Sequence, residues 1–338
     1  MKRLNLTLKS AALSILAFGL AGSFDAKAQQ DALFSQYMFN TLAINPAYAG
    51  SRDVLSATAM YRDQWGGLDG APKTGTFSMD MPISKERMGI GIQLFNDRIG
   101  VENRTGGYFS YAFRVKLSPK TTLALGAQAG VYNLLNTLSD VKNVGAVDPN
   151  FLSSANVNKI LPNVGAGVYI SNDRSYLGIS APNLIEHKIS GAVDGKAKLF
   201  RHYFAQMGFV VPMGSSLKLK PSMQFRYVAG APLSVDGNMN LWIKDKVGLG
   251  ISGRLSQLTS LAGNTGGVGK LGDMVLGMLE VQLTPQLRFG YAYDFTMNAL
   301  NNPTKTGKSR LLGLPTHEGM LRYEFGYGRN KILTPRYF

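Results

Sequence analysis

One nine-residue stretch near the end of the chain decides the fold class. It reads Leu287-Arg288-Phe289-Gly290-Tyr291-Ala292-Tyr293-Asp294-Phe295. Every odd-numbered position is apolar or aromatic, and every position between them is small or charged. Because successive side chains of a strand point to opposite faces, this period of two predicts a β-strand with one apolar face and one polar face.

The same alternation recurs throughout the chain, for example at 109–117, 217–227 and 321–327. Strands of about ten residues with this repeat are typical of membrane barrels, whereas the strands of soluble sandwiches usually have about five or six residues. We therefore predict an all-β fold: a transmembrane antiparallel β-barrel of the outer membrane with about 14 strands. The predicted strands span 53–63, 74–82, 88–97, 106–117, 121–133, 162–171, 175–181, 201–211, 217–228, 232–243, 247–254, 273–283, 287–296 and 318–328.

The predicted links between these strands alternate in length. The short, polar links are 82–87, 118–120, 172–174, 212–216, 244–246 and 284–286. The others are 64–73, 98–105, 134–161, 182–200, 255–272 and 297–317, which are long, and 229–231, which is short. Short periplasmic turns and long external loops are typical of outer-membrane barrels, and an even number of strands places both termini in the periplasm.

Composition excludes several other classes of protein. Of the 338 residues, 45% are hydrophobic and only 17% are charged, which excludes a disordered chain. There is no cysteine, so disulfides, zinc–thiolate sites, iron–sulfur clusters and thiol nucleophiles are absent. His187, His202 and His317 lie in separate segments without the spacing of metal ligands. We expect no metal site, no cofactor and no catalytic residues.

The first 28 residues are predicted to be a secretory signal peptide. Lys2, Arg3 and Lys9 precede an apolar stretch at 11–24, and the small residues around Ala28 resemble a cleavage site. The apolar stretch is too short to cross a bilayer as a helix. The expected organisation is a signal peptide at 1–28, a periplasmic N-terminal segment at 29–52, the barrel at 53–328 and a periplasmic C-terminal tail at 329–338.

Basic residues occupy many of the positions predicted to face the lumen. These are Arg62, Arg114, Lys116, Lys218, Lys220, Arg226, Arg254, Arg288 and Arg322. The acidic residues on the same face are fewer, namely Asp80, Asp236, Glu280, Asp294 and Glu324. Two interpretations stay open: a cavity that favours anionic solutes, or a barrel filled by its own ion pairs. The net charge of +15 is spread over alternate strand positions, so no nucleic-acid partner is expected.

Both predicted periplasmic ends contain apolar and aromatic residues that are candidates for docking a partner. They are Phe34, Tyr37, Met38, Phe39, Asn45, Pro46 and Tyr48 in the N-terminal segment, and Arg336, Tyr337 and Phe338 in the tail. A segment this apolar is not expected to lie free in water. For the N-terminal segment three placements are open: a plug in the lumen, a docking element for a periplasmic partner, or a cap on the barrel rim.

Motifs along the chain point to a known family. They are FSQYMFN at 34–40, INPAYAG at 44–50, YRDQW at 61–65 and NDRIG at 96–100, with DPNF at 148–151 and TPRYF at the end. In this combination the sequence resembles the PorP/SprF family of type IX secretion system membrane proteins. The resemblance covers essentially the whole chain after the signal peptide.

The resemblance implies a non-enzymatic outer-membrane component of the machine that exports large proteins across the outer membrane of Bacteroidota. It also implies partners: a periplasmic ring lipoprotein and its partner, the C-terminal domain of a secreted surface adhesin, and outer-membrane lipids. That adhesin association links the family to gliding motility. The competing hypotheses are an anion-favouring solute channel and a hydrolase embedded in the barrel.

Overall fold

The structure is a computed structural model that describes residues 34, 36–84, 86–137, 156–188, 198–229, 231, 233–255, 274–296 and 315–325. Its strands are β1 (Ser56–Asp63), β2 (Lys73–Ile83), β3 (Met88–Ile99), β4 (Glu102–Lys116), β5 (Thr122–Asn136), β6 (Val157–Ser171), β7 (Ser175–Ala181), β8 (His202–Phe209), β9 (Val211–Met213), β10 (Leu217–Val228), β11 (Ser234–Ile243), β12 (Val247–Leu255), β13 (Met274–Gln282), β14 (Leu287–Thr296) and β15 (Thr316–Glu324).

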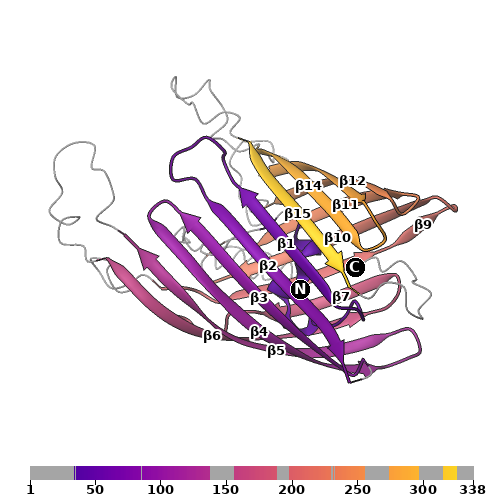
Figure 1. Ribbon diagram of the computed structural model, residues 1–338, viewed down its shortest axis with the longest axis horizontal. Coiled ribbons are helices and arrows are strands. Elements are labelled where there is room, and N and C mark those ends of the chain that lie inside the picture. Colours follow the sequence, from indigo (N-terminus) through magenta and orange to yellow (C-terminus); the bar gives the residue numbers. More distant parts are fainter. Residues whose placement is uncertain are drawn as a thin grey trace, which may run out of the picture.

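These strands form one closed antiparallel sheet (Figure 1). Each strand pairs with its neighbours in sequence, and the ring closes where β1 pairs with β15. Both β8 and β9 pair with β10, and they are two parts of one strand interrupted at Val210. The barrel therefore has 14 strands, as the sequence predicts. Closure pairs each strand with a neighbour on both sides, although β7 reaches only the second part of β6, from Ala166 to Ser171. A closed ring suits a membrane because lipid offers no hydrogen-bond partners to an open edge.

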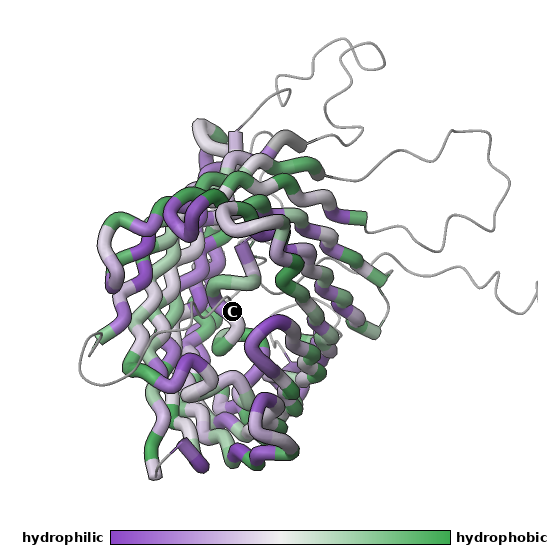
Figure 2. Tube along the Cα trace, turned by 90° about the vertical axis from the view of Figure 1, so that its right-hand side faces the viewer, coloured by the Kyte–Doolittle hydropathy of each residue, from purple (hydrophilic) through white to green (hydrophobic). Residues whose placement is uncertain are grey.

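The wall separates an apolar outer face from a polar inner face. Along β4 the side chains of Phe109, Tyr111 and Phe113 are exposed on the outside, whereas Ser110 and Arg114 are buried on the inside. Figure 2 shows this alternation as green and purple residues following one another along the strands. The period of two in the sequence thus corresponds to side chains that face lipid and the lumen in turn.

One link differs from its prediction. The segment 98–105 was expected to be a long loop, but β3 continues to Ile99 and β4 begins at Glu102, so only a tight turn remains. Gly100 makes the turn possible with a positive φ of 58°, a conformation that glycine adopts readily. Because the residues near this turn are polar, the sequence shows no clear alternation there. They nevertheless pair across the two strands, with Asp97 opposite Arg104. Polarity marked the end of the apolar belt, not the end of the strands.

Before β1 the chain forms three short helical turns inside the ring of strands. They are η1 (Tyr37–Phe39), α2 (Thr41–Ile44) and η2 (Pro46–Tyr48), drawn in indigo in Figure 1. Their residues contact the inner faces of β2 to β6. No helix among the described residues is both long enough and apolar enough to cross a membrane.

Candidate functional site

The lumen contains a segment of the same chain, Gln36–Asp53, which we call the plug. Its backbone turns are set by local sequence: the Asn45 side chain accepts a hydrogen bond from the Ala47 N–H at 3.0 Å, and Pro46 occupies the first position of η2. Asparagine as a cap followed by proline is a favoured start for a helical turn. Gln36, Asn45, Ala47 and Ala49 have no exposed surface, so the plug is part of the protein interior.

Glycines in the wall allow the plug backbone to come very close. A Cβ atom added at Gly126 on β5 would lie 2.1 Å from the Ala47 nitrogen, and one at Gly89 on β3 would lie 1.9 Å from the Ala49 oxygen. Any other residue at these positions would therefore collide with the plug. Next to this contact, the Asn45 amide donates to the Val168 carbonyl at 3.0 Å. The wall is shaped to receive η2.

Hydrogen bonds fix the first part of the plug to strands on opposite sides of the barrel. The Gln36 N–H donates to Glu318 Oε1 on β15 at 2.8 Å, and the Tyr37 hydroxyl lies 3.1 Å from Ser222 Oγ on β10. Burial raises the pKa of the Tyr37 phenol well above its usual value, which keeps the hydroxyl neutral. Asn40 is held from β2, because its amide donates to Thr76 Oγ1 at 3.0 Å.

Ion pairs fasten the last part of the plug near the short turns. Arg52 is buried and pairs with Glu324 on β15, and Asp53 pairs with Arg114 on β4 at 2.6 Å. Burial lowers the pKa of Arg52, but the Glu324 carboxylate and the Tyr48 hydroxyl together raise it by more, so the net pKa is above its ordinary value. A buried pair of this kind depends on both partners, because either charge alone would be stranded in a poorly solvated site.

Apolar contacts complete the seat of the plug. Leu42, Ala47 and Tyr48 form one buried cluster with Tyr169 and Tyr176 of the wall, and the Tyr48 and Tyr169 rings meet edge to face at 5.5 Å. A second buried cluster joins the plug to β1 and β15; its residues are Phe39, Met60 and Met320, with Phe34 and Met38 packed against them. Burial of these aromatic and aliphatic side chains stabilises the plug in its seat.

Most of the residues predicted as candidate lumen charges contact other residues of the barrel or the plug. Arg322 donates to Thr58 Oγ1 at 3.1 Å and to the Phe39 carbonyl, so it holds the plug. Lys220 and Arg288 lie over the ring of Trp242, at 4.1 and 4.6 Å from its centroid. Such contacts are attractive because the ring face carries partial negative charge.

The other members of that set lie nearer the turns or within the wall. Lys218 pairs with Asp245 at 2.6 Å, and Lys116 pairs with Glu86 at 3.6 Å at an exposed site. Arg226 is buried on the inner face of β10. Arg62, also on the predicted inner face, pairs with both Asp294 and Glu318.

The structure places the predicted docking residues of the N-terminal segment inside the barrel. Tyr37, Phe39, Asn45, Pro46 and Tyr48 are buried against the wall. Phe34 and Met38 pack against the same clusters. Contact between these side chains and a separate protein would require the plug to leave its seat. Arg336, Tyr337 and Phe338 lie outside the described residues.

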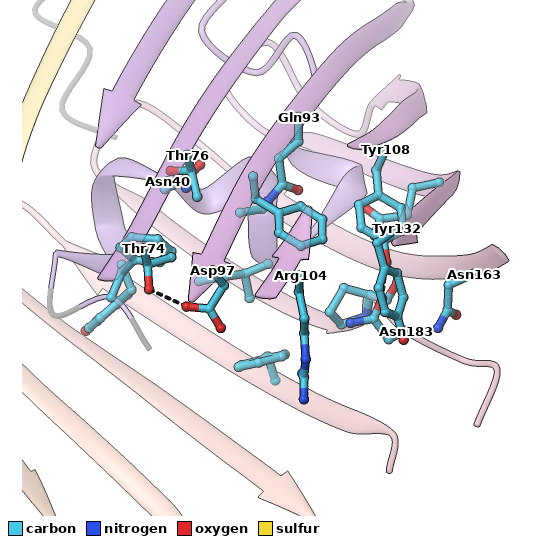
Figure 3. Close-up of a pocket in the computed structure, with 18 of the residues that line it drawn as sticks. Asn40, Thr74, Thr76, Gln93, Asp97, Arg104, Tyr108, Tyr132, Asn163 and Asn183 are labelled. Atoms are coloured by element: carbon cyan, nitrogen blue, oxygen red, sulfur yellow. Dashed lines mark hydrogen bonds between the residues drawn. The ribbon is translucent and has the colours of Figure 1, made fainter. Parts of the chain in front are cut away.

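A cavity of about 150 Å³ lies between the plug and the wall, toward the end opposite the short turns (Figure 3). Its lining includes aromatic rings on β3, β4 and β5 and carboxamide side chains on β3, β5, β6 and β10 and just after β7; those used below are Gln93, Phe95, Tyr108, Gln128, Tyr132, Asn163, Asn183 and Gln224. Sequence reasoning missed this group. The only signal in the sequence was two large side chains, Tyr108 and Tyr132, at inner positions that adjoin the small residues Gly106, Ser110 and Gly130. Within the described residues there is no cluster of three or more residues suited to a metal ion.

The chain is similar to known proteins in sequence and in fold. A family model described as type IX secretion system membrane protein PorP/SprF matches residues 26–313. No curated protein matches the chain. Similar solved structures include a Pseudomonas aeruginosa FadL homologue, with 14% identity, a TM-score of 0.45 and coverage of 84% of this chain and 94% of the other. Another is Omp33 of Acinetobacter baumannii, with 10% identity, a TM-score of 0.41 and coverage of 80% and 98%.

Proposed function

The chain belongs to the PorP/SprF family of type IX secretion system membrane proteins, and from this membership we propose that it couples secretion machinery to a surface protein. In this proposal the barrel sits in the outer membrane after removal of residues 1–28, with both ends in the periplasm. It contacts a periplasmic ring lipoprotein and its partner on that side. On the other side it helps to secrete or anchor a large adhesin used in gliding motility, without enzymatic chemistry.

The observation that carries the proposal is the plug. A barrel that conducts small solutes needs a continuous aqueous path, and here the lumen is occupied by a segment held from several strands. The basic residues that suggested anion selectivity are largely engaged with the plug, with acids or with Trp242. A filled, rigid barrel is suited to presenting surfaces to other proteins.

The orientation follows from the lengths of the links. The turns at 84–87, 172–174 and 244–246 are short, whereas the links at 137–156 and 297–315 at the opposite end are long. Outer-membrane barrels keep short turns in the periplasm and long loops outside. In this arrangement the ends of the chain would be available to the periplasmic ring, and the long links to the secreted protein.

Deletion of the gene tests the proposal. We expect loss of one or more large surface proteins from the cell surface, with unchanged uptake of small solutes. A tagged copy, cross-linked in cells and purified from membranes, should carry a periplasmic lipoprotein with it. Normal display of surface proteins in the deletion strain, together with no such partner, would contradict the proposal.

The alternative is an anion-favouring solute channel, and it predicts the reverse pattern. Deletion would then slow the uptake of small anions and leave surface proteins in place. The two candidates are therefore separated by the same strain, in two assays made side by side.

A further inference from the structure

The cavity between the plug and the wall has two kinds of lining, each suited to a different part of a ligand. The first is aromatic: Phe95 and Tyr108 are stacked, with centroids 6.0 Å apart, and the Tyr132 centroid lies 6.3 Å from that of Phe95. The second consists of carboxamides, among them Gln93 and Gln128, which lie on the same strands as Phe95 and Tyr132. Sites for small molecules typically combine apolar walls with a few polar groups that fix orientation.

Some of these carboxamides are held in place by the surrounding protein. Gln128 donates to the Pro182 carbonyl at 2.9 Å, and Asn163 donates to the Ile185 carbonyl at 3.0 Å. The Asn183 oxygen accepts a hydrogen bond from the Tyr108 hydroxyl at 2.9 Å, which also fixes that ring. These groups are therefore held in place before a ligand arrives and need little reorganisation to accept one.

Other carboxamides have hydrogen-bonding capacity left over. Gln93 is only 8% exposed and lines the cavity, and its carboxamide has no hydrogen-bond partner among the described residues. Gln224 is 4% exposed, and its Nε2 atom likewise lacks a partner there. Leaving a buried polar group unpaired costs about 1–3 kcal/mol. Unused donors and acceptors at the wall of a cavity point to a ligand that supplies their partners.

The charged side chains at the cavity are engaged with other residues of the barrel. Asp97 accepts a hydrogen bond from the Thr74 hydroxyl at 2.6 Å (Figure 3, dashed line), and Arg104 pairs with Glu102 at 2.6 Å. An anionic ligand would find Arg104 already paired with Glu102, and a purely apolar ligand would leave the carboxamides of Gln93 and Gln224 unpaired. The lining suits a neutral ligand with an apolar face and several hydroxyl groups on its edge.

We propose that this cavity binds one neutral pyranose ring of a glycan. The C–H bonds of a sugar ring carry partial positive charge and pack on the negative faces of aromatic rings. A carboxamide places a donor beside an acceptor, which matches two neighbouring hydroxyls of the sugar. The volume, about 150 Å³, is comparable to that of a cavity that holds one six-membered ring. This site is separate from the coupling role proposed above and does not depend on it.

The test uses the purified full-length barrel in a detergent without a sugar head group. Binding of maltotriose, cellotriose, mannotriose and N,N′,N″-triacetylchitotriose is measured by titration calorimetry, with N-acetyl-tyrosinamide as a competing probe. We expect saturable binding of at least one saccharide. Gln93→Leu, which removes the amide, should weaken that binding at least tenfold, equivalent to about 1.4 kcal/mol. Gln224→Leu should weaken it in the same direction, and Tyr132→Ala should abolish it.

The matched control is Val131→Ala, because Val131 precedes Tyr132 on β5 and is exposed on the outer face. It should bind like the wild type. Absence of saturable binding to any of the saccharides would overturn the proposal. So would binding that the three cavity variants leave unchanged, or displacement of the saccharide by N-acetyl-tyrosinamide, which would assign the cavity to a peptide side chain. Because the readout is binding and not surface display, these outcomes leave the coupling proposal intact.

Discussion

At the residue scale, the plug is held by two kinds of position that act in opposite ways. Gly126 and Gly89 contribute by lacking a side chain, which lets the plug backbone touch the wall. Arg52 and Glu324 contribute by pairing two buried charges. The sequence marked Glu324 as a lumen residue but contained no sign of its partner, because the plug and β15 are more than 270 residues apart.

Replacing Gly126 with leucine should push η2 out of its seat. The added Cβ alone would lie 2.1 Å from the Ala47 nitrogen, and overpacking of this kind costs about 1–3 kcal/mol. Urea unfolding of the purified protein in micelles measures the loss of stability. Gly277→Leu is the control, since a Cβ at Gly277 meets nothing within 4 Å. Equal stability of the two variants would argue against the close contact.

Replacing Arg52 with alanine should destabilise the barrel far more than removing an exposed cation. Breaking a buried pair strands the remaining charge and costs about 3–5 kcal/mol. The comparison is Lys73→Ala, because the Lys73–Asp63 pair spans 3.9 Å with the lysine largely exposed, and exposed pairs contribute about 0–1 kcal/mol. Adding Glu324→Gln to the Arg52→Ala variant should restore part of the lost stability. If the two single variants unfold at the same urea concentration, Arg52 is not buried against Glu324.

At the element scale, the strands were predictable and the plug was only partly so. Alternation in the sequence located the strands because each one faces lipid on one side, and this constraint acts on every residue. The extension of β3 and β4 around Gly100 escaped that signal, since both faces there are polar. The helical turns before β1 have no alternation, and their apolar character fits a plug, a docking element or a cap equally well.

A disulfide between the plug and β2 tests where the plug lies. The chain has no cysteine of its own, so Asn40→Cys with Ser78→Cys provides the only two thiols. The Ser78 hydroxyl donates to Asn40 Oδ1 at 2.7 Å, and side chains this close fall within the reach of a disulfide. Oxidation should give a faster-migrating band on a non-reducing gel. Asn40→Cys with Phe77→Cys should not, because Phe77 faces outward; cross-linking in both pairs would mean that the plug has no fixed seat.

At the scale of the whole molecule, the closed wall and the family were both accessible from the sequence. The wall follows from alternation and from link lengths, and the family follows from motifs such as INPAYAG in the plug. The state of the lumen was not accessible. Inner residues such as Arg322 and Lys220 are the same letters in the sequence whether they line an aqueous path or contact Phe39 and Trp242, so only the three-dimensional contacts distinguish the two.

The central claim is that this barrel is filled by its own plug and acts through contacts with other proteins, not as a pore. Planar-bilayer conductance of the purified full-length protein tests it most directly. We predict no steady current for the wild type, and none for the Asn40→Cys, Ser78→Cys variant after oxidation. A steady, anion-selective current through the wild-type protein would contradict the claim and favour the solute channel.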